Sequence, residues 1–297
     1  MFKGINAIDF SKRFKSNEDC YQYLMEQKWE KGFKCLKCGG TVSIKGRTYY
    51  YRRCQNCRYD ESVLANTLFH DMRIPVIKAF YMLFRITTKK KGMSTVELAQ
   101  EVGVTQRTAW LFKRKVQVAM NNTSKLKGEV DVDETLMGFH TSRQKGGRNL
   151  EEREALLMAT EILPDGRTGN IALQCIENFK AMTLKPAIQN MISPDAAIRT
   201  DNYCSYRYLQ RTGMNIQTQP SQQGKAFEQI HRQIMLFKNW IVGTHHRWSE
   251  HHLSAYADEY TFRFNRRNAR KQIFHAALQR IFYQIPHPYA VLKAQSE

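Results

Sequence analysis

The chain has 297 residues, of which 42% are hydrophobic, and it carries a formal net charge of +19. Its length allows two or three domains with a sizeable core, and its apolar content excludes a disordered protein. It has no run of about 18 apolar residues and no signal-peptide core, so we expect a cytoplasmic protein with no membrane partner. The basic excess favours a polyanionic partner, because such binding releases counterions; a merely solvated basic surface has the same composition.

The first predicted helix covers residues 16–27, SNEDCYQYLMEQ. Ser16 fits its N-cap, and Asp19 stands where the second residue of a capping box belongs. Cys20 shares a side of this helix with Tyr23 and Leu24, which predicts that Cys20 is a core residue.

Four of the seven cysteines form two Cys-x-x-Cys pairs, Cys35 with Cys38 and Cys54 with Cys57, separated by fifteen residues. The odd total argues against a disulfide framework. Four thiolates close a tetrahedral zinc site, which is structural because no coordination position stays open for catalysis. Two strand-like runs around a glycine turn lie between the pairs, so the segment is predicted to be a zinc ribbon. Two unrelated pairs of reduced cysteines are the alternative.

The next segment predicts three helices, the first of them apolar-rich and starting at Pro75. Ser94 fits the N-cap of a second helix that runs to about Val102, Gly103 fits a sharp turn, and Thr105 fits the cap of the third helix. This outline is typical of a helix-turn-helix that binds DNA, and a plain helical hairpin is the alternative. The third helix would offer DNA the side chains of Gln106, Arg107, Lys113 and Arg114.

A short strand is predicted in GEVDVDET, residues 128–135, where valine and aspartate alternate. The alternation puts Asp131 and Asp133 on one face. Carboxylates there suit a hard divalent cation, and a solvated edge strand is the alternative.

The remainder predicts a mixed sheet with a crossover helix. The runs ALLMATEI and GNIALQCI form a hairpin, MTLKPAIQNMI a helix, and AAIRTDN a strand that ends at Asp201. A long helix follows over residues 226–243, in which Glu228, His231 and Lys238 lie near one face. Two further helices are predicted, over HHLSAYADEYTFRF and over about 270–283.

A histidine cluster follows the long helix, at His245, His246, His251 and His252. Such a cluster can bind a metal ion, but histidines in this arrangement also serve as phosphate donors and helix caps.

The whole chain from Phe10 to about Arg270 resembles DDE-type transposases of bacterial insertion sequences, family fifteen-ninety-five, with a zinc ribbon and an ISXO-type catalytic domain. The motifs that carry the resemblance are KWEKGFKCLKCGG, in which Leu36 replaces the usual proline, TLFHDMRIP, VDET, RTDN, HRQIMLFKNWIVGTHH and HLSAYADEYTFRFNRR. It implies a multidomain α+β protein. The expected domains are an N-terminal helix and zinc ribbon (1–70), a helix-turn-helix region (71–125), and an RNase H-like catalytic domain with a mixed sheet and C-terminal helices (126–297).

The resemblance also implies the catalytic residues. VDET carries the first aspartate, Asp133, in preference to Asp131, and RTDN carries the second, Asp201. The family places a Glu, Asn or His seven residues before a lysine, which here selects His231 before Lys238. Glu228 is the main rival for the third metal ligand, and Glu259 is a weaker one. Zinc would be structural, and magnesium or manganese would be catalytic.

The implied function is a transposase that binds terminal inverted repeats, cleaves the DNA strand and transfers it into target DNA, as a homodimer or higher oligomer on DNA. Such a protein is expected to be associated with the nucleoid. The alternatives are a DNA-binding regulator without chemistry and an RNase H-like nuclease without strand transfer.

Overall fold

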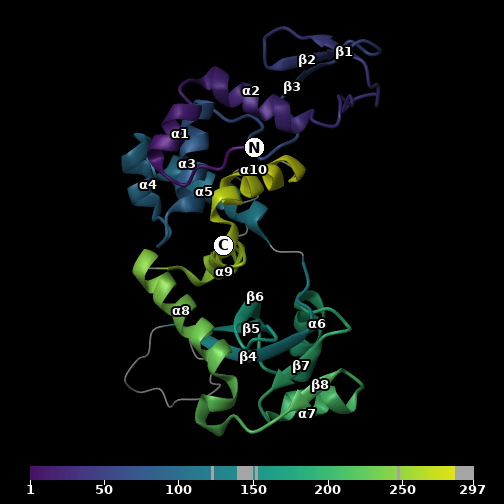
Figure 1. Ribbon diagram of the computed structural model, residues 1–297, viewed down its shortest axis with the longest axis vertical. Helices are drawn as coiled ribbons and strands as arrows, with labels where there is room; N and C mark the ends of the chain where they lie inside the picture. The colour runs from purple at the N-terminus through teal and green to yellow at the C-terminus, as the bar shows by residue number, and fades with distance from the viewer. Residues whose placement is uncertain (122–123, 139–149, 151–152, 246–247, 285–297) are drawn as a thin grey trace. The chain divides into compact units, whose positions relative to one another are not determined.

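The computed structural model describes residues 1–121, 124–138, 150, 153–245 and 248–284, and the chain divides into two compact units (Figure 1). Unit 1 joins Met1–Met120 to the C-terminal residues from Ala269 onward, and unit 2 is Asn121–Asn268. Among the described residues, no helix has both the length and the apolarity needed to cross a membrane. The multidomain α+β architecture is confirmed.

Unit 1 combines a small three-stranded sheet with a helical core. The sheet has the order β1-β2-β3 and is antiparallel. Its elements are α1 (Ala7–Arg13), α2 (Asn17–Lys28), β1 (Ser43–Lys45), β2 (Tyr51–Cys54), β3 (Asp60–Ser62), α3 (Val76–Thr88), α4 (Thr95–Val102), α5 (Gln106–Met120) and α10 (Ile273–Tyr283). A 3₁₀ segment, η3 (Arg267–Gln272), precedes α10.

The core of unit 1 is a cluster of aromatic rings from both ends of the chain. Phe274 of α10 lies 5.6 Å from Phe2 and 5.7 Å from Phe80 between ring centroids. Tyr23 of α2 is also buried there, and its hydroxyl lies 2.9 Å from Nδ1 of His275. Helix α10 therefore completes unit 1, whereas the expected domain scheme grouped it with the catalytic region.

The helix caps of unit 1 follow the sequence signals. Ser16 and Asp19 form a capping box on α2, and Cys20 is fully buried, as predicted. The Ser94 hydroxyl accepts from the backbone of Glu97 at the start of α4, which ends at Gly103 in a left-handed conformation (φ +64°). Two helices joined by a short turn are thus present at the predicted positions.

The predicted DNA-facing residues of α5 are only partly exposed. Gln106 and Arg107 are exposed, but Lys113 and Arg114 are 2% and 6% exposed. The Lys113 ammonium donates to the carbonyl of Met93 (2.7 Å). The prediction that Lys113 and Arg114 face DNA is wrong, because both side chains are buried in a helix that packs against α3, α4 and α10.

Unit 2 contains a five-stranded mixed sheet with the order β6-β5-β4-β7-β8. Strands β4, β5 and β6 pair antiparallel, and β4, β7 and β8 pair parallel. The elements are β4 (Glu129–Met137), β5 (Glu154–Ile162), β6 (Thr168–Ile176), α6 (Ala181–Met191), β7 (Ala197–Thr200), α7 (Cys204–Arg211), β8 (Ile216–Thr218), η1 (Gln222–Phe227), α8 (Glu228–Thr244), η2 (Glu250–His252) and α9 (Leu253–Phe264). The predicted hairpin, crossover helix and strand before Asp201 are all confirmed.

The sheet of unit 2 lies between α8 on one face and α6 with α7 on the other (Figure 1). Val130 and Val132 pack in the core beneath α6 and α7. Met137, on the opposite face of β4, packs in the core beneath α8. Because side chains alternate along a strand, Asp131 and Asp133 share the α8 face with Met137. The alternative of a solvated edge strand is wrong, since β4 is the central strand.

A buried ion pair fixes the parallel half of the sheet. Asp131 is 1% exposed, and its Oδ1 accepts from the Arg199 guanidinium of β7 at 2.7 and 2.8 Å. Burial raises the pKa of Asp131, and Arg199 opposes that rise. The same guanidinium also pairs with Glu129 (2.7 Å), so it joins β4 to β7.

Replacing Arg199 with alanine is expected to lower the free energy of unfolding of unit 2 by about 2 kcal/mol, because Asp131 would be left buried without its counter-ion. The loss is limited to this size because Arg199 is partly exposed, so water already weakens the ion pair. Urea unfolding followed by circular dichroism would measure the loss. Arg167→Ala is the matched control, since Arg167 forms an exposed pair with Asp165. Equal stability of the two variants would contradict a structural role for the Asp131 pair.

Candidate functional site

The four cysteines of the two Cys-x-x-Cys pairs meet at one point of unit 1. Their sulfur atoms all lie within 4.8 Å of one another, with 3.6 Å between Cys35 and Cys57 and 3.6 Å between Cys38 and Cys54. Tetrahedral zinc–thiolate bonds of about 2.3 Å would place the sulfurs about 3.8 Å apart. The donor set and its spacing therefore fit a structural zinc ion.

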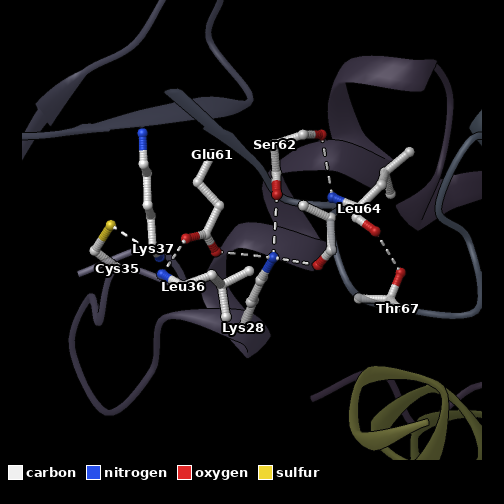
Figure 2. A network of polar contacts seen from close by, with 9 residues as sticks. Lys28, Cys35, Leu36, Lys37, Glu61, Ser62, Leu64 and Thr67 are labelled. Carbon is white, nitrogen blue, oxygen red and sulfur yellow. Dashed lines mark hydrogen bonds and ion pairs between the residues drawn. The ribbon is translucent and has the colours of Figure 1, made fainter. Parts of the chain in front are cut away.

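A buried polar network attaches this cluster to α2 (Figure 2). The Lys28 ammonium contacts Glu61 (3.1 Å) and donates to the carbonyls of Ser62 (3.0 Å) and Ala65 (2.9 Å). Glu61 is 1% exposed and also accepts from the backbone N–H of Leu36 (3.2 Å). A proline, the family's usual residue at Leu36, could not donate that bond.

The second candidate site lies where α8 crosses β4. Nε2 of His231 lies 3.1 Å from Oδ2 of Asp133. The other oxygen of Asp133 accepts from the backbone N–H of Glu134 (2.9 Å). Two ligands at right angles on a magnesium ion, each at about 2.1 Å, are about 3 Å apart. The two side chains are therefore spaced as neighbouring ligands of one cation would be.

The position of Asp201 is set by the pairing of β7 with β4. This residue directly follows β7, which pairs with β4 in the register Glu129↔Ala197 and Asp131↔Arg199. Continued by two residues, that register sets Asp201 next to Asp133. The ligand atoms of Asp133, Asp201 and His231 do not all lie within 4.8 Å of one another; in the described part of the chain, the four cysteines alone do so.

The pKa of the Tyr206 hydroxyl is influenced by the carboxylates near Asp133. Tyr206 is fully buried on the opposite side of β4, and burial is the main reason that its pKa lies well above the ordinary value. The charges of Glu134, Asp133 and Asp201 raise it further. The three carboxylates therefore act on one neighbourhood, as expected from the register of β4 and β7.

Lys238 supplies positive charge on the same face of α8, two turns beyond His231. Partial burial lowers its pKa, the charge of Arg153 lowers it further, and Asp133 opposes both effects. Arg153, just before β5, is 8% exposed. Sequence reasoning did not single out Arg153 or Arg199. The one sequence signal that could have identified Arg199 is its place in the RTDN motif, two residues before Asp201.

The rivals for the third ligand position are engaged elsewhere. The Glu228 side chain is 69% exposed and pairs with Arg232 one turn along α8 (2.5 Å). Glu259 is fully buried on α9 and pairs with Arg263 (3.4 Å). His231 is thus the candidate that contacts Asp133.

The histidine cluster forms no metal-type group among the described residues. The His245 ring stacks on Tyr256 with centroids 4.3 Å apart, and His252 precedes α9. His246 lies outside the described residues.

Comparison with known protein families decides the class. The model for the ISXO2-like transposase domain matches residues 125–265, and the model for the transposase zinc-ribbon domain matches residues 15–60. The chain belongs to this family of transposases. Comparison with curated proteins gave no match. The matched ranges include the four cysteines, Asp133, Asp201, His231 and Lys238, so the transposase carries both candidate sites inside its two family domains.

Purified transposase is expected to contain about one zinc ion per chain. Cys54→Ser should lose the zinc and open the ribbon, because the small sheet has little core of its own. Elemental analysis and limited proteolysis of residues 30–62 would measure both effects. Cys204→Ser, which changes an exposed cysteine outside the ribbon, is the control. A protease-resistant ribbon without zinc would contradict the structural role.

Proposed function

We propose that this transposase binds the terminal inverted repeats of its insertion sequence, cleaves the DNA strand at their ends and joins it to target DNA. The observation that carries the proposal is the contact between Asp133 and His231 in the matched domain. The contact joins two side chains of metal-ligating type, and a continued register of β4 and β7 would bring Asp201 near them.

Asp133, Asp201 and His231 would hold the catalytic ions. Carboxylate oxygens suit magnesium and manganese, and the imidazole shifts the preference toward manganese because it is the softer donor. When bound, two such ions activate the attacking oxygen and stabilise the leaving oxygen of the phosphodiester. The Asp133 side chain is 22% exposed, so this set would be accessible to DNA.

Lys238 would neutralise the phosphate of the cleaved strand. Its lowered pKa reflects partial burial and the neighbouring Arg153, and a bound phosphate would relieve the repulsion between these two cations. Lys238 shares its helix with His231, so one rigid element would position both a metal ligand and a phosphate contact.

Unit 1 would recognise the DNA ends. The zinc ribbon and the α4–turn–α5 segment, acting as a helix-turn-helix, belong to this unit, and Gln106 and Arg107 are exposed at the start of α5. A fragment that ends at residue 125 would lack α10 and its buried Phe274, so binding is best measured on the full chain. We expect a homodimer or higher oligomer on DNA, because two element ends must be cut together.

His231→Ala is expected to lower metal-dependent cleavage of a labelled terminal-repeat duplex by about 100-fold or more, because one metal ligand is lost. Glu228→Ala should keep most of the activity, since Glu228 is exposed and paired with Arg232. His231→Glu should retain activity and shift its preference from manganese toward magnesium, because a carboxylate is the harder ligand.

Both alanine variants must first be shown to fold and to bind the repeat normally. An inactive Glu228→Ala beside an active His231→Ala would show that Glu228 is the third ligand. Cut ends without a joined product would favour a nuclease, and intact DNA with every divalent metal would favour a regulator.

Arg107→Ala is expected to weaken binding of the full chain to its own terminal repeat by about tenfold, the cost of losing one direct base or phosphate contact. Lys12→Ala is the control, since it removes the same charge from another exposed position in unit 1. Fluorescence anisotropy at several salt concentrations would measure both. Equal losses in the two variants would mean that α5 does not read the repeat.

A further inference from the structure

The small sheet of the zinc ribbon has two different faces. Its inner face carries Cys54 and Glu61, which are 0% and 1% exposed. Ile44 of β1 and Arg53 of β2 are cross-strand partners on the opposite side, which is the outer face of the ribbon. Ile44 is 41% exposed on that face, and Val42, two residues before it, is 59% exposed. The outer face therefore presents apolar side chains to solvent.

An arginine stacked on a tyrosine extends this outer face. The Arg47 guanidinium lies 4.2 Å from the centroid of the Tyr51 ring, and its Nη2 donates to the Tyr51 hydroxyl (2.5 Å). Tyr51 stands two residues before Arg53 in β2, so it lies on the same face of the sheet. Arg47 is exposed. One side of its planar guanidinium therefore rests on the tyrosine ring, and the other side can accept a further planar group.

The turn between β1 and β2 holds this stack in place. A Cβ added to Gly46 would lie 2.6 Å from Cβ of Tyr51 and 2.9 Å from its carbonyl carbon, distances that real Cβ atoms essentially never show. The N–H of Gly46 donates to the Tyr51 carbonyl (3.0 Å), and the N–H of Tyr51 donates to the Thr48 carbonyl (3.1 Å). Glycine lets the backbone of the turn approach Tyr51, and the two hydrogen bonds fix that backbone on both sides of Arg47.

Charge and shape identify the kind of ligand that fits this face. Residues 31–62 contain eight lysines and arginines against two carboxylates, so the ribbon attracts a polyanion. In a DNA duplex the faces of the bases are stacked on one another, and a protein reaches only the base edges and the phosphates. A single strand exposes its base faces, which stack on aromatic rings and on guanidinium planes. An apolar face with a stacked arginine therefore fits a single strand better than a duplex.

We infer that the outer face of the ribbon, formed by Val42, Ile44, Arg47, Tyr51 and Arg53, is a binding site for single-stranded DNA. One base would stack on the Arg47 guanidinium, and the apolar side chains of Val42 and Ile44 would contact the next nucleotide. The basic residues of the ribbon would attract the phosphates. The inference rests on the proposed function for the origin of the strand, which cleavage at an element end would make available.

The test measures fluorescence anisotropy of the full chain with two labelled strands of equal length, oligothymidylate and an abasic strand with the same phosphates. Wild type should bind oligothymidylate about tenfold more tightly, because only this strand has bases to stack. Arg47→Lys keeps the charge but loses the planar group, so it should bind oligothymidylate about tenfold more weakly and the abasic strand as wild type does. Arg58→Lys is the matched control, since Arg58 is an exposed arginine in the turn of the second cysteine pair, and it should match wild type with both strands.

A second variant, Tyr51→Leu, removes the ring that supports the guanidinium and should also weaken oligothymidylate binding. If it loses zinc and opens the ribbon, Arg47→Lys still decides, because Arg47 is exposed. Equal binding of the two strands by wild type, or an Arg47→Lys variant that matches Arg58→Lys, would overturn the inference. Tighter binding of oligouridylate would also overturn it, because the face would then prefer RNA. The proposed function is tested separately, by the preference of wild type for a terminal-repeat duplex over a random duplex.

Discussion

The contact between Asp133 and His231 depends on how α8 packs across β4. Ile230, Ile234 and Phe237 of α8 are buried against the face of the sheet that carries Met137, Leu156 and Met158. This apolar contact fixes the distance of α8 from the sheet and its rotation about its own axis. It therefore also fixes the position of the His231 imidazole over β4. A site built between a helix and a central strand is held more rigidly than one on loops, because both backbones are fixed by burial and by main-chain hydrogen bonds.

The two aspartates of β4 share a face but differ in environment. Asp131 is 1% exposed and paired with Arg199, whereas the Asp133 side chain is 22% exposed and reaches His231. Two residues along a strand span about 7 Å, enough to move from the part of β4 that pairs with β7 to the part beyond that pairing. One carboxylate is therefore tied to the neighbouring strand, and the other remains available for a cation. The alternation of side chains along β4 puts Asp131 and Asp133 on the same face of the sheet. The pairing of Asp131 with Arg199 of β7 is what makes their environments different.

Much of this organisation was predictable because its causes are local. Capping signals located α2 and α4, cysteine spacing located the ribbon, and alternation gave the face of Asp133. Lys113 and Arg114 were misread because their burial depends on the tertiary packing of α5, whose neighbours include α10 from the far end of the chain. Helical geometry could not choose between Glu228 and His231, since both lie near one face, and resemblance and tertiary contact were needed. The elements not predicted, α1, β3, α7 and β8, span only three to eight residues each, too short to show a clear period.

An imidazole in place of a third carboxylate changes the charge balance of the proposed site. Asp133 and Asp201 together contribute two negative charges, whereas a site with glutamate at position 231 would have three. Lys238 and the buried Arg153 stand close enough to influence each other, so the surroundings are already rich in positive charge. Divalent cations would then be held less tightly by the protein alone, and the phosphate of the bound strand would supply a larger share of their ligands.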